Sequence, residues 1–245
     1  MSSLTAIRVE GLPEIEQGAR LGELIAGLTE IEPGDVLVVA QKVVSKAEGR
    51  LRKLSSVIPG AEARKLAAVL GKEPALVELV LEESSEILRA EGGVLIVETN
   101  HGFVCANAGI DSSNVPEDDM VCLLPEDPDA SARRIRHEIA GPVIGVVISD
   151  SFGRAWRLGQ AEVAIGCAGM QPLDDWRGRH DAHGRELEAT LISVADEVAA
   201  AADLVRGKDS GIPVVIVRGL DRFVTPEDGP GAATLRRPRD EDLFR

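Results

Sequence analysis

Two aspartates stand at the ends of apolar segments that are typical of buried strands. Asp150 closes the segment GPVIGVVISD and is followed by Ser151, and Asp111 stands in AGIDSSN after another expected strand. Mg²⁺ and Mn²⁺ prefer such oxygen ligands and usually combine one or two carboxylates with substrate phosphates. We therefore expect Asp111, Asp150 and Ser151 to bind a divalent cation. The alternative is that each Asp is an ordinary turn residue at the end of a strand.

Basic residues gather in two parts of the sequence. Lys42 and Lys46 come directly after the apolar segment 36–40, where open α/β sheets bind ligands; solvated loop lysines are the alternative. Arginines gather between residues 154 and 185, where glycines and a proline predict loops, and a guanidinium group suits carboxylate and phosphate oxygens. This segment therefore predicts a binding site for an anionic substrate, with pairing to neighbouring acids as the alternative. Its arginines are Arg154, Arg157, Arg177, Arg179 and Arg185.

The common nucleotide-binding motifs are absent from the sequence. It contains no GxxxxGK[ST], and no GxGxxG follows an expected strand. Phosphate would then be held by backbone N–H groups of glycine-containing turns and by single lysines. QKVVSKAEGR and RGKDSGIP are the best candidates for such turns.

The composition is that of a folded, acidic protein. Of its 245 residues 44% are hydrophobic, which is enough for one large core or two lobes. A net charge of −14 repels nucleic acid and anionic membranes over most of the surface, and an aromatic content of 2% without Tyr argues against base stacking. We therefore expect small-molecule substrates, held by local cations, and neither a nucleic-acid nor a membrane partner.

Two features predict a cytoplasmic location. The segment MSSLTAIRVEGLP has neither a basic start nor an apolar core, and no apolar run approaches the roughly 20 residues that span a bilayer. Cys105, Cys122 and Cys167 offer neither a disulfide framework nor a CxxC metal pair, so we expect them to be reduced residues of the core.

The expected elements alternate irregularly along the chain. Apolar runs and helical spacing predict strands at 7–10, 36–40, 92–99, 101–109, 141–150 and 212–220, and helices at 19–28, 61–71, 74–89, within 125–141 and at 187–205. Hairpin-like neighbours among the strands favour an α+β or mixed α/β fold over a regular doubly wound sheet. From residue 224 onward the polar sequence predicts a tail or linker.

Several motifs occur in one order along most of the chain: GLPEI, QKVVSKAEGR, HGFVCANAGIDSSN, SDSFGRAWRLGQAEVAIGCAG, DWRGRHDAHGREL and GKDSGIPVVIVRGL. In this order the sequence resembles the coenzyme F-420:L-glutamate ligase family over roughly residues 7–223. The resemblance implies a ligase domain at 1–223 with a two-lobed fold, mixed sheets and no P-loop. Residues 224–245 are then a C-terminal tail or linker, similar to the junction that leads into a second domain in some relatives.

The resemblance also implies an activity. Such enzymes use GTP to add L-glutamate to the phospholactyl carboxylate of the deazaflavin cofactor precursor, and then extend the chain through γ-linked glutamates. They use Mg²⁺ or Mn²⁺, with K⁺ as a helper ion, and form intertwined homodimers. The substrate carboxylate attacks the γ-phosphoryl group of GTP, and the amine of glutamate displaces phosphate from the acyl phosphate.

Matching the motifs residue by residue assigns roles in this sequence. The metal positions are Asp111, Asp150 and Ser151. The mechanism then makes Asp111, Asp150 and Lys46 the expected catalytic residues, and the arginine-rich segment supplies Arg154, Arg157 and Arg177 as the expected substrate-binding residues. The nucleotide-binding positions are Leu12, Pro13, Glu14, Ile15, Gln41, Lys46, Asn114, Arg206, Gly207, Lys208 and Gly211.

The chain departs from the pattern of its relatives at two of these positions. Gln41 stands where many relatives have Ser or Thr, and Lys208 stands where archaeal members have Gln. Because an ammonium group cannot be a metal ligand, Lys208 puts the number of metal ions in doubt.

Two other functions stay open at this point. A non-catalytic GTP- and metal-binding module would bind the nucleotide without turnover. A metal-dependent phosphohydrolase would release phosphate without an amine acceptor.

Overall fold

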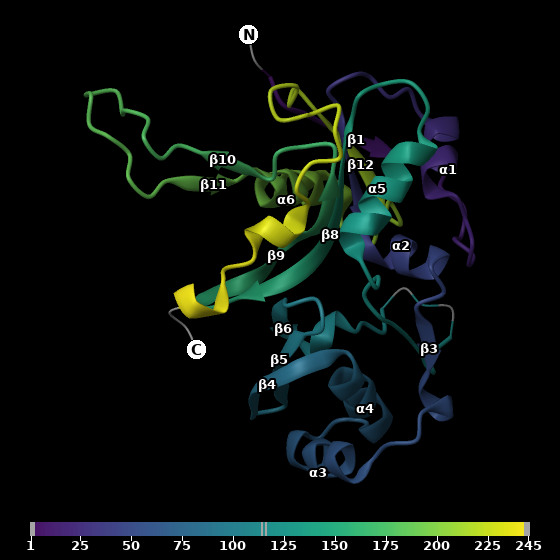
Figure 1. Ribbon diagram of the computed structural model, residues 1–245. Helices are drawn as coiled ribbons and strands as arrows, with labels where there is room; N and C mark the ends of the chain where they lie inside the picture. The colour runs from purple at the N-terminus through teal and green to yellow at the C-terminus, as the bar shows by residue number, and fades with distance from the viewer. Residues whose placement is uncertain (1–2, 114, 116, 243–245) are drawn as a thin grey trace.

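The computed structural model describes residues 3–113, 115 and 117–242, and the chain forms two lobes (Figure 1). The larger lobe is built on a five-stranded sheet in the order β1 (Thr5–Val9), β12 (Val214–Arg218), β2 (Val36–Ala40), β8 (Gly145–Arg154) and β9 (Arg157–Ala168). Only β2 and β8 run parallel; the other neighbours are antiparallel. This mixed sheet confirms the expected α+β class.

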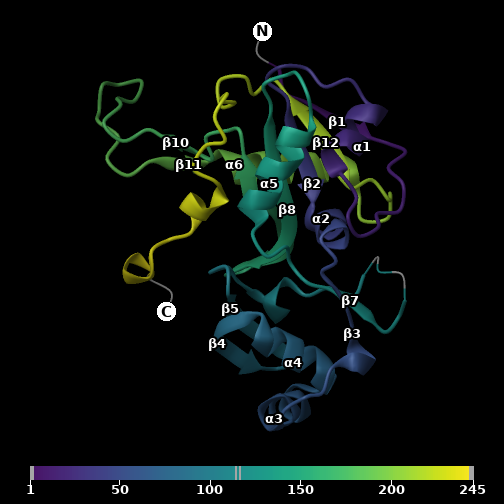
Figure 2. The same ribbon diagram turned by 45° about the vertical axis from the view of Figure 1, so that its right-hand side comes forward.

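Helices cover both faces of this sheet, which explains why its central strands are almost wholly apolar. On β2, Leu37 and Val39 pack towards α1 (Leu21–Leu28) and α5 (Pro128–Glu138), whereas Val36 and Val38 pack towards α6 (Val194–Arg206). Figure 2 shows α5 in front of β8, with α6 on the other side. The larger lobe therefore has two cores, one on each face of the sheet.

The smaller lobe has a core of its own. Helices α3 (Ala61–Leu70) and α4 (Pro74–Glu82) pack against the antiparallel strands β4 (Ser84–Glu91), β5 (Val94–Thr99) and β6 (Val104–Ala106). The pair β3 (Leu51–Lys53) and β7 (Met120–Cys122) lies where the chain enters and leaves this lobe.

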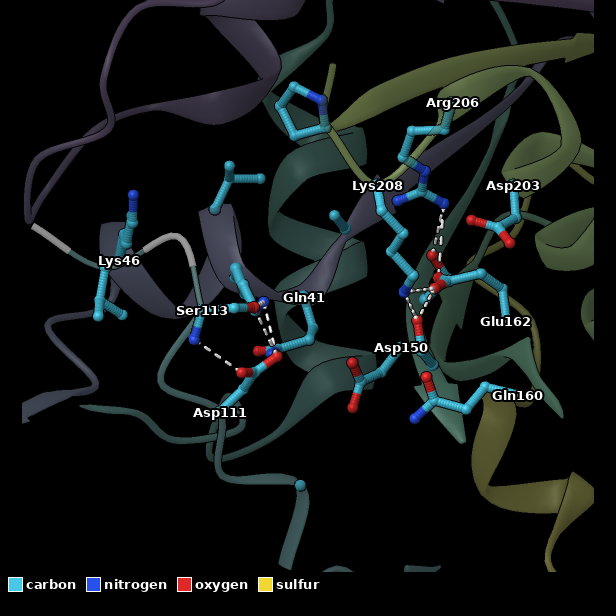
Figure 3. Close-up of a pocket in the computed structure, with 18 of the residues that line it drawn as sticks. Gln41, Lys46, Asp111, Ser113, Asp150, Gln160, Glu162, Asp203, Arg206 and Lys208 are labelled. Atoms are coloured by element: carbon cyan, nitrogen blue, oxygen red, sulfur yellow. Dashed lines mark hydrogen bonds and ion pairs between the residues drawn. The ribbon is translucent and has the colours of Figure 1, made fainter. Parts of the chain in front are cut away.

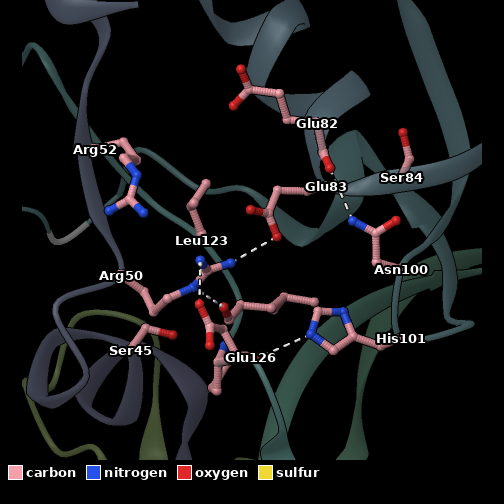
Figure 4. Close-up of polar contacts among 12 residues, drawn as sticks. Ser45, Arg50, Arg52, Glu82, Glu83, Ser84, Asn100, His101, Leu123 and Glu126 are labelled. Atoms are coloured by element: carbon pink, nitrogen blue, oxygen red, sulfur yellow. Dashed lines mark hydrogen bonds and ion pairs between the residues drawn. The ribbon is translucent and has the colours of Figure 1, made fainter.

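A buried arginine forms polar contacts that connect the two lobes (Figure 4). Arg50 donates from Nε to the carbonyl oxygen of Leu124 at 2.9 Å and from Nη2 to the Glu83 carboxylate at 2.7 Å. Glu83 follows α4 of the smaller lobe, so one guanidinium group connects that helix to the larger lobe.

Three expectations for the elements are wrong. The helix expected at 74–89 ends at Glu82, because the following residues pair with β5 as strand β4. The helix expected at 187–205 begins at Val194, because the three residues before it form β11 (Leu191–Ser193) and pair with β10 (Leu173–Asp175). The segment 151–168, expected to be loop-like, forms the long β8–β9 hairpin, because its alternating residues continue the ladder of β8.

The segment from residue 224 onward lies along the larger lobe as far as it is described. Arg136 of α5 forms an ion pair with Asp228 at 2.8 Å and also donates to the carbonyl oxygen of Thr225. Ala232 is buried against β9 within η3 (Ala232–Leu235), and the short helix η4 (Arg239–Glu241) follows it. The domain boundary at residue 223 stays a prediction.

Two findings concern the cysteines and the membrane. Cys105, Cys122 and Cys167 are buried and unpaired, as expected. Within the described residues no helix has the length and apolar character needed to cross a membrane.

Candidate active site

A cleft of about 1080 Å³ lies at the junction of the lobes. Its walls come from the turn after β1, the start of α2 (Gln41–Ala47), the segment after β6, the middle of β8 and β9, and the end of α6 with the loop that follows it. The predicted positions in this cleft are Leu12, Pro13, Glu14, Ile15, Gln41, Lys46, Asp111, Asp150, Ser151, Arg206, Gly207, Lys208 and Gly211. The fold thus gathers segments from both ends of the chain into one site.

The register of β8 explains how this strand serves the cleft. Its pairing with β2 ends at Ala40 and Ser149, where α2 begins, but its pairing with β9 continues to Arg154. Beyond the end of β2 the two faces of β8 therefore open into the cleft. Neighbouring residues of a strand point to opposite faces, so Asp150 and Ser151 contribute to different halves of the site.

The half next to α2 contains a carboxylate that is already paired. Lys42 Nζ lies 2.7 Å from Asp111 Oδ2, and the backbone N–H of Ser113 donates to Asp111 Oδ1 at 2.8 Å (Figure 3). Burial acts to raise the pKa of Asp111, but the hydrogen bonds from Lys42 and Ser113 outweigh it and hold the pKa below its ordinary value. Asp111 is therefore ionised at neutral pH.

Asp150 has a different environment. Its side chain is half-buried, and within the described part of the chain no lysine or arginine forms an ion pair with it. Burial raises the pKa of Asp150 to about 7, and the nearby charge of Glu162 acts in the same direction. Lys42 favours the ionised form only from a distance, so this carboxyl group has no contacting cation among the described residues.

The half next to α6 contains a linked set of charges. Ser151 donates its hydroxyl hydrogen to Glu162, Lys208 donates to the Ser151 hydroxyl oxygen, and Arg206 Nη2 donates to Ser149 at 3.0 Å. Glu162 is only 6% exposed, and Arg206 Nη2 lies 3.5 Å from its other oxygen. In this half, Glu162 therefore has two protein cations close to it, and Asp203 of α6 also lines the cleft.

Gln41 and Lys46 both lie on α2. Lys46 pairs with Glu14 of the turn after β1. The Gln41 side chain is buried and accepts a hydrogen bond from Ser45 at 3.0 Å, while its Nε2 has no partner among the described residues. A buried donor without a partner is costly, so a ligand acceptor in the cleft would stabilise it.

The three arginines predicted to bind substrate do not line the cleft of the single chain. Arg154 donates to the carbonyl oxygen of Leu158 near the tip of the β8–β9 hairpin, and Arg157 is exposed beside it. Arg177 forms a 2.6 Å ion pair with Asp175 on the β10–β11 arm. Their role stays a prediction, and predicted Asn114 lies outside the described residues.

Other residues of the site were not predicted from the sequence. Glu162, Gln160 and Asp203 line the cleft. Glu162 carries a signal that the sequence contains, because it is the one charged residue in the apolar strand AEVAIGCA. Its position opposite Ser151 depends on the β8–β9 register, which the pattern alone does not reveal.

The carboxylates suit a hard cation only in part. Among the described residues no three acidic, His or Cys side chains come together to hold a metal ion. Asp150 fits a cation because its charge is uncompensated, and Asp111 lies in the same cleft. An ion held there would take its remaining ligands from substrate phosphates and water, as Mg²⁺ commonly does.

Comparison with known proteins identifies the family. The model of the F420-0:Gamma-glutamyl ligase family matches residues 11–219. The chain belongs to this family. A coenzyme F420:L-glutamate ligase of Methanothermobacter thermautotrophicus is 45% identical over 99% of both chains, and one of Archaeoglobus fulgidus is 46% identical over 97% of this chain and 94% of its own length. A relative with the same name from Haloarcula marismortui is 43% identical over 97% of this chain and 94% of its own.

The part matched to the F420-0:Gamma-glutamyl ligase family contains the whole cleft, since its lining runs from Leu12 to Pro213. A ligase that activates a carboxylate directly with a nucleotide needs no protein nucleophile. The one thiol that lines the cleft is unsuited to that role, because burial raises the pKa of Cys105 to about 12. The chemistry of this ligase family therefore agrees with a cleft made of carboxylates, lysines and glycine turns.

Proposed function

We propose that this protein is a GTP-dependent coenzyme F-420-0:L-glutamate ligase. It adds L-glutamate to the phospholactyl carboxylate of the deazaflavin precursor through an acyl phosphate and then extends the product through γ-linked glutamates. The observation that supports this most strongly is the family match over residues 11–219, which contains the cleft with its carboxylates and lysines.

The nucleotide is bound between the turn after β1 and the loop after α6. Gly207 and Gly211 of that loop have positive φ angles of 71° and 66°, which favour turns whose backbone N–H groups bind phosphate. Lys46 supplies charge from α2, and Gln41 Nε2 donates to an acceptor on the ligand. Leu12 and Ile15 supply apolar contacts for the base or ribose.

Asp111 and Asp150 hold a Mg²⁺ or Mn²⁺ ion together with the phosphates. When bound, such an ion offsets the charge of the phosphates and aligns them for transfer. Asp150 would be ionised when it holds the cation, and the residues that line the cleft would position the substrate carboxylate beside the γ-phosphate. K⁺ would act as a helper ion, as the family resemblance implies.

A homodimer would explain how arginines that lie outside the cleft of their own chain can still bind the substrate. The β8–β9 hairpin and the β10–β11 arm project from the larger lobe (Figure 1). Two large apolar side chains at the hairpin tip, Trp156 and Leu158, are 80% and 99% exposed, and a partner that covered them would remove this apolar surface from water. In a homodimer these projections bring Arg154, Arg157 and Arg177 towards the partner, where they bind the anionic substrate.

Mass spectrometry tests the proposal. The deazaflavin precursor is incubated with the protein, GTP, Mn²⁺ and L-glutamate, with Asp150→Asn as a matched inactive variant. We expect a mass gain of one or more glutamate units that needs GTP and is lost in the variant. Loss of GTP without a glutamate product points to a phosphohydrolase, and tight GTP binding without turnover points to a binding module. The cytoplasmic location stays a prediction.

A further inference from the structure

The half of the cleft next to α6 contains a lysine where the family resemblance implies a metal ligand. Ser151 was expected to bind a divalent cation, but its hydroxyl group is already engaged twice. It donates to Glu162 and accepts from Lys208. A serine hydroxyl has one hydrogen and two lone pairs, so one lone pair is left, and a metal ion that used it would lie next to the ammonium group of Lys208.

The charges around Glu162 also argue against a divalent ion at Ser151. Lys208 Nζ lies 3.8 Å from Glu162 Oε1, and Arg206 Nη2 lies 3.5 Å from Oε2. One buried carboxylate therefore has two protein cations within 4 Å. A divalent ion bound to Ser151 would lie beside the ammonium group of Lys208, and like charges so close repel each other strongly.

The half next to α2 has the opposite balance. Two carboxylates, Asp111 and Asp150, share one lysine, Lys42, and only Asp111 is in contact with it. A cation entering the cleft is therefore drawn to Asp150, and no cation is needed at Glu162. The two halves differ because Asp150 and Ser151 occupy opposite faces of β8.

We propose that the ammonium group of Lys208 takes the place of a second divalent cation at Ser151 and Glu162. This protein then binds one divalent ion per cleft, at Asp111 and Asp150. The ammonium group of Lys208 supplies the positive charge on the other side of the phosphates. The inference rests on the proposed function, because it takes Asp111 and Asp150 as the site of the single ion.

The side chain of Lys208 is suited to this role. It is 71% exposed and extends into the cleft from the loop after α6, so its amine reaches Ser151 without being fixed in the core. Replacing it by Gln removes the positive charge and supplies an amide oxygen that can bind a metal ion. The variant should therefore gain a divalent site made by Ser151, Glu162 and the new Gln.

Counting bound Mn²⁺ tests this directly. Purified protein is dialysed to equilibrium against Mn²⁺ with a non-hydrolysable GTP analogue, and the ions per chain are measured by elemental analysis. We expect one ion for the wild type, two for Lys208→Gln, and one again for the double variant Lys208→Gln/Glu162→Gln. Lys65→Gln, an exposed lysine on α3 of the smaller lobe, is the control and should match the wild type. Circular dichroism checks that each variant is folded.

The outcomes separate this inference from the proposed function. Two ions in the wild type, or no gain of an ion in Lys208→Gln, overturn the role of Lys208. Asp150→Asn should lose one ion in both the wild-type and the Lys208→Gln backgrounds. If the wild type binds no ion while Lys208→Gln binds one, the role of Lys208 stands and the metal site of the proposed function fails.

Discussion

Replacing Asp150 by Asn should stabilise the metal-free protein while it removes the metal site. Burial raises the pKa of this carboxyl group from 3.8 to about 7. The unfolded chain releases the proton near pH 4, whereas the folded chain keeps it until pH approaches 7. The stabilising contribution of the protonated group is therefore complete below the unfolded pKa and is lost as pH rises through the folded pKa.

The magnitude follows from the same linkage. Between pH 5 and pH 7 the wild type loses about 1.4 kcal/mol per pH unit from this group, or about 3 kcal/mol in total. This is an upper bound, because water that enters the cleft screens the charge. Asn cannot ionise, so the free energy of unfolding of the variant does not fall with pH for this reason. We expect it to be more stable than the wild type at pH 8, with a much smaller difference at pH 5.

Urea unfolding in EDTA at pH 5 and pH 8 measures the effect. Asp111→Asn is the control with the opposite sign: the pKa of Asp111 is lowered, so its ionised form stabilises the fold at neutral pH and its loss should destabilise the protein at pH 8. Added Mn²⁺ should stabilise the wild type and not Asp150→Asn. The reasoning is refuted if Asp150→Asn is less stable than the wild type at pH 8, or if its advantage is the same at both pH values.

Three further substitutions test the site and the packing that positions it. Lys46→Ala should raise the KM for GTP about tenfold, the loss of about 1.4 kcal/mol of binding, while Lys65→Ala leaves the steady-state kinetics unchanged. Gly166→Ala should cost about 1–3 kcal/mol in urea unfolding, because the new Cβ would lie 2.3 Å from a backbone oxygen of α5; Gly153→Ala, with nothing within 4 Å, should cost less than 1 kcal/mol. Arg50→Met should cost about 1–3 kcal/mol by the same assay, because the half-buried Glu83 carboxylate loses its partner, and a cost below 1 kcal/mol would contradict its role between the lobes.

The sequence predicts the strands of the larger lobe well because these strands are buried on both faces. Residues 36–40 form β2 within the expected bounds, and 212–220 contains β12. The helix expected at 74–89 fails for a physical reason: its second half pairs with β5, and this long-range contact outweighs the local helical spacing. The periodicity of a short apolar segment does not show which other segment of the chain it will pair with.

The site residues also divide into those that local sequence predicts and those that depend on long-range pairing. Asp111, Asp150 and Lys46 were found because each follows an apolar strand or lies in a family motif, and all three line the cleft. Glu162 was missed because its importance depends on pairing with Ser151 across the hairpin. The closeness of the arginines in the sequence predicts one cluster, but the β8–β9 hairpin and the β10–β11 arm place Arg154, Arg157 and Arg177 outside the cleft of their own chain.

The length of β8 relative to β2 accounts for the two charge environments of the cleft. If both strands ended at the same level, Asp150 and Ser151 would be separated by the sheet and could not serve one ligand. Because β2 stops at Ala40 and β8 continues with β9, both residues reach the same cleft from opposite faces. Shortening the hairpin would therefore disturb both halves together, whereas a change at Lys208 should act mainly on the half next to α6.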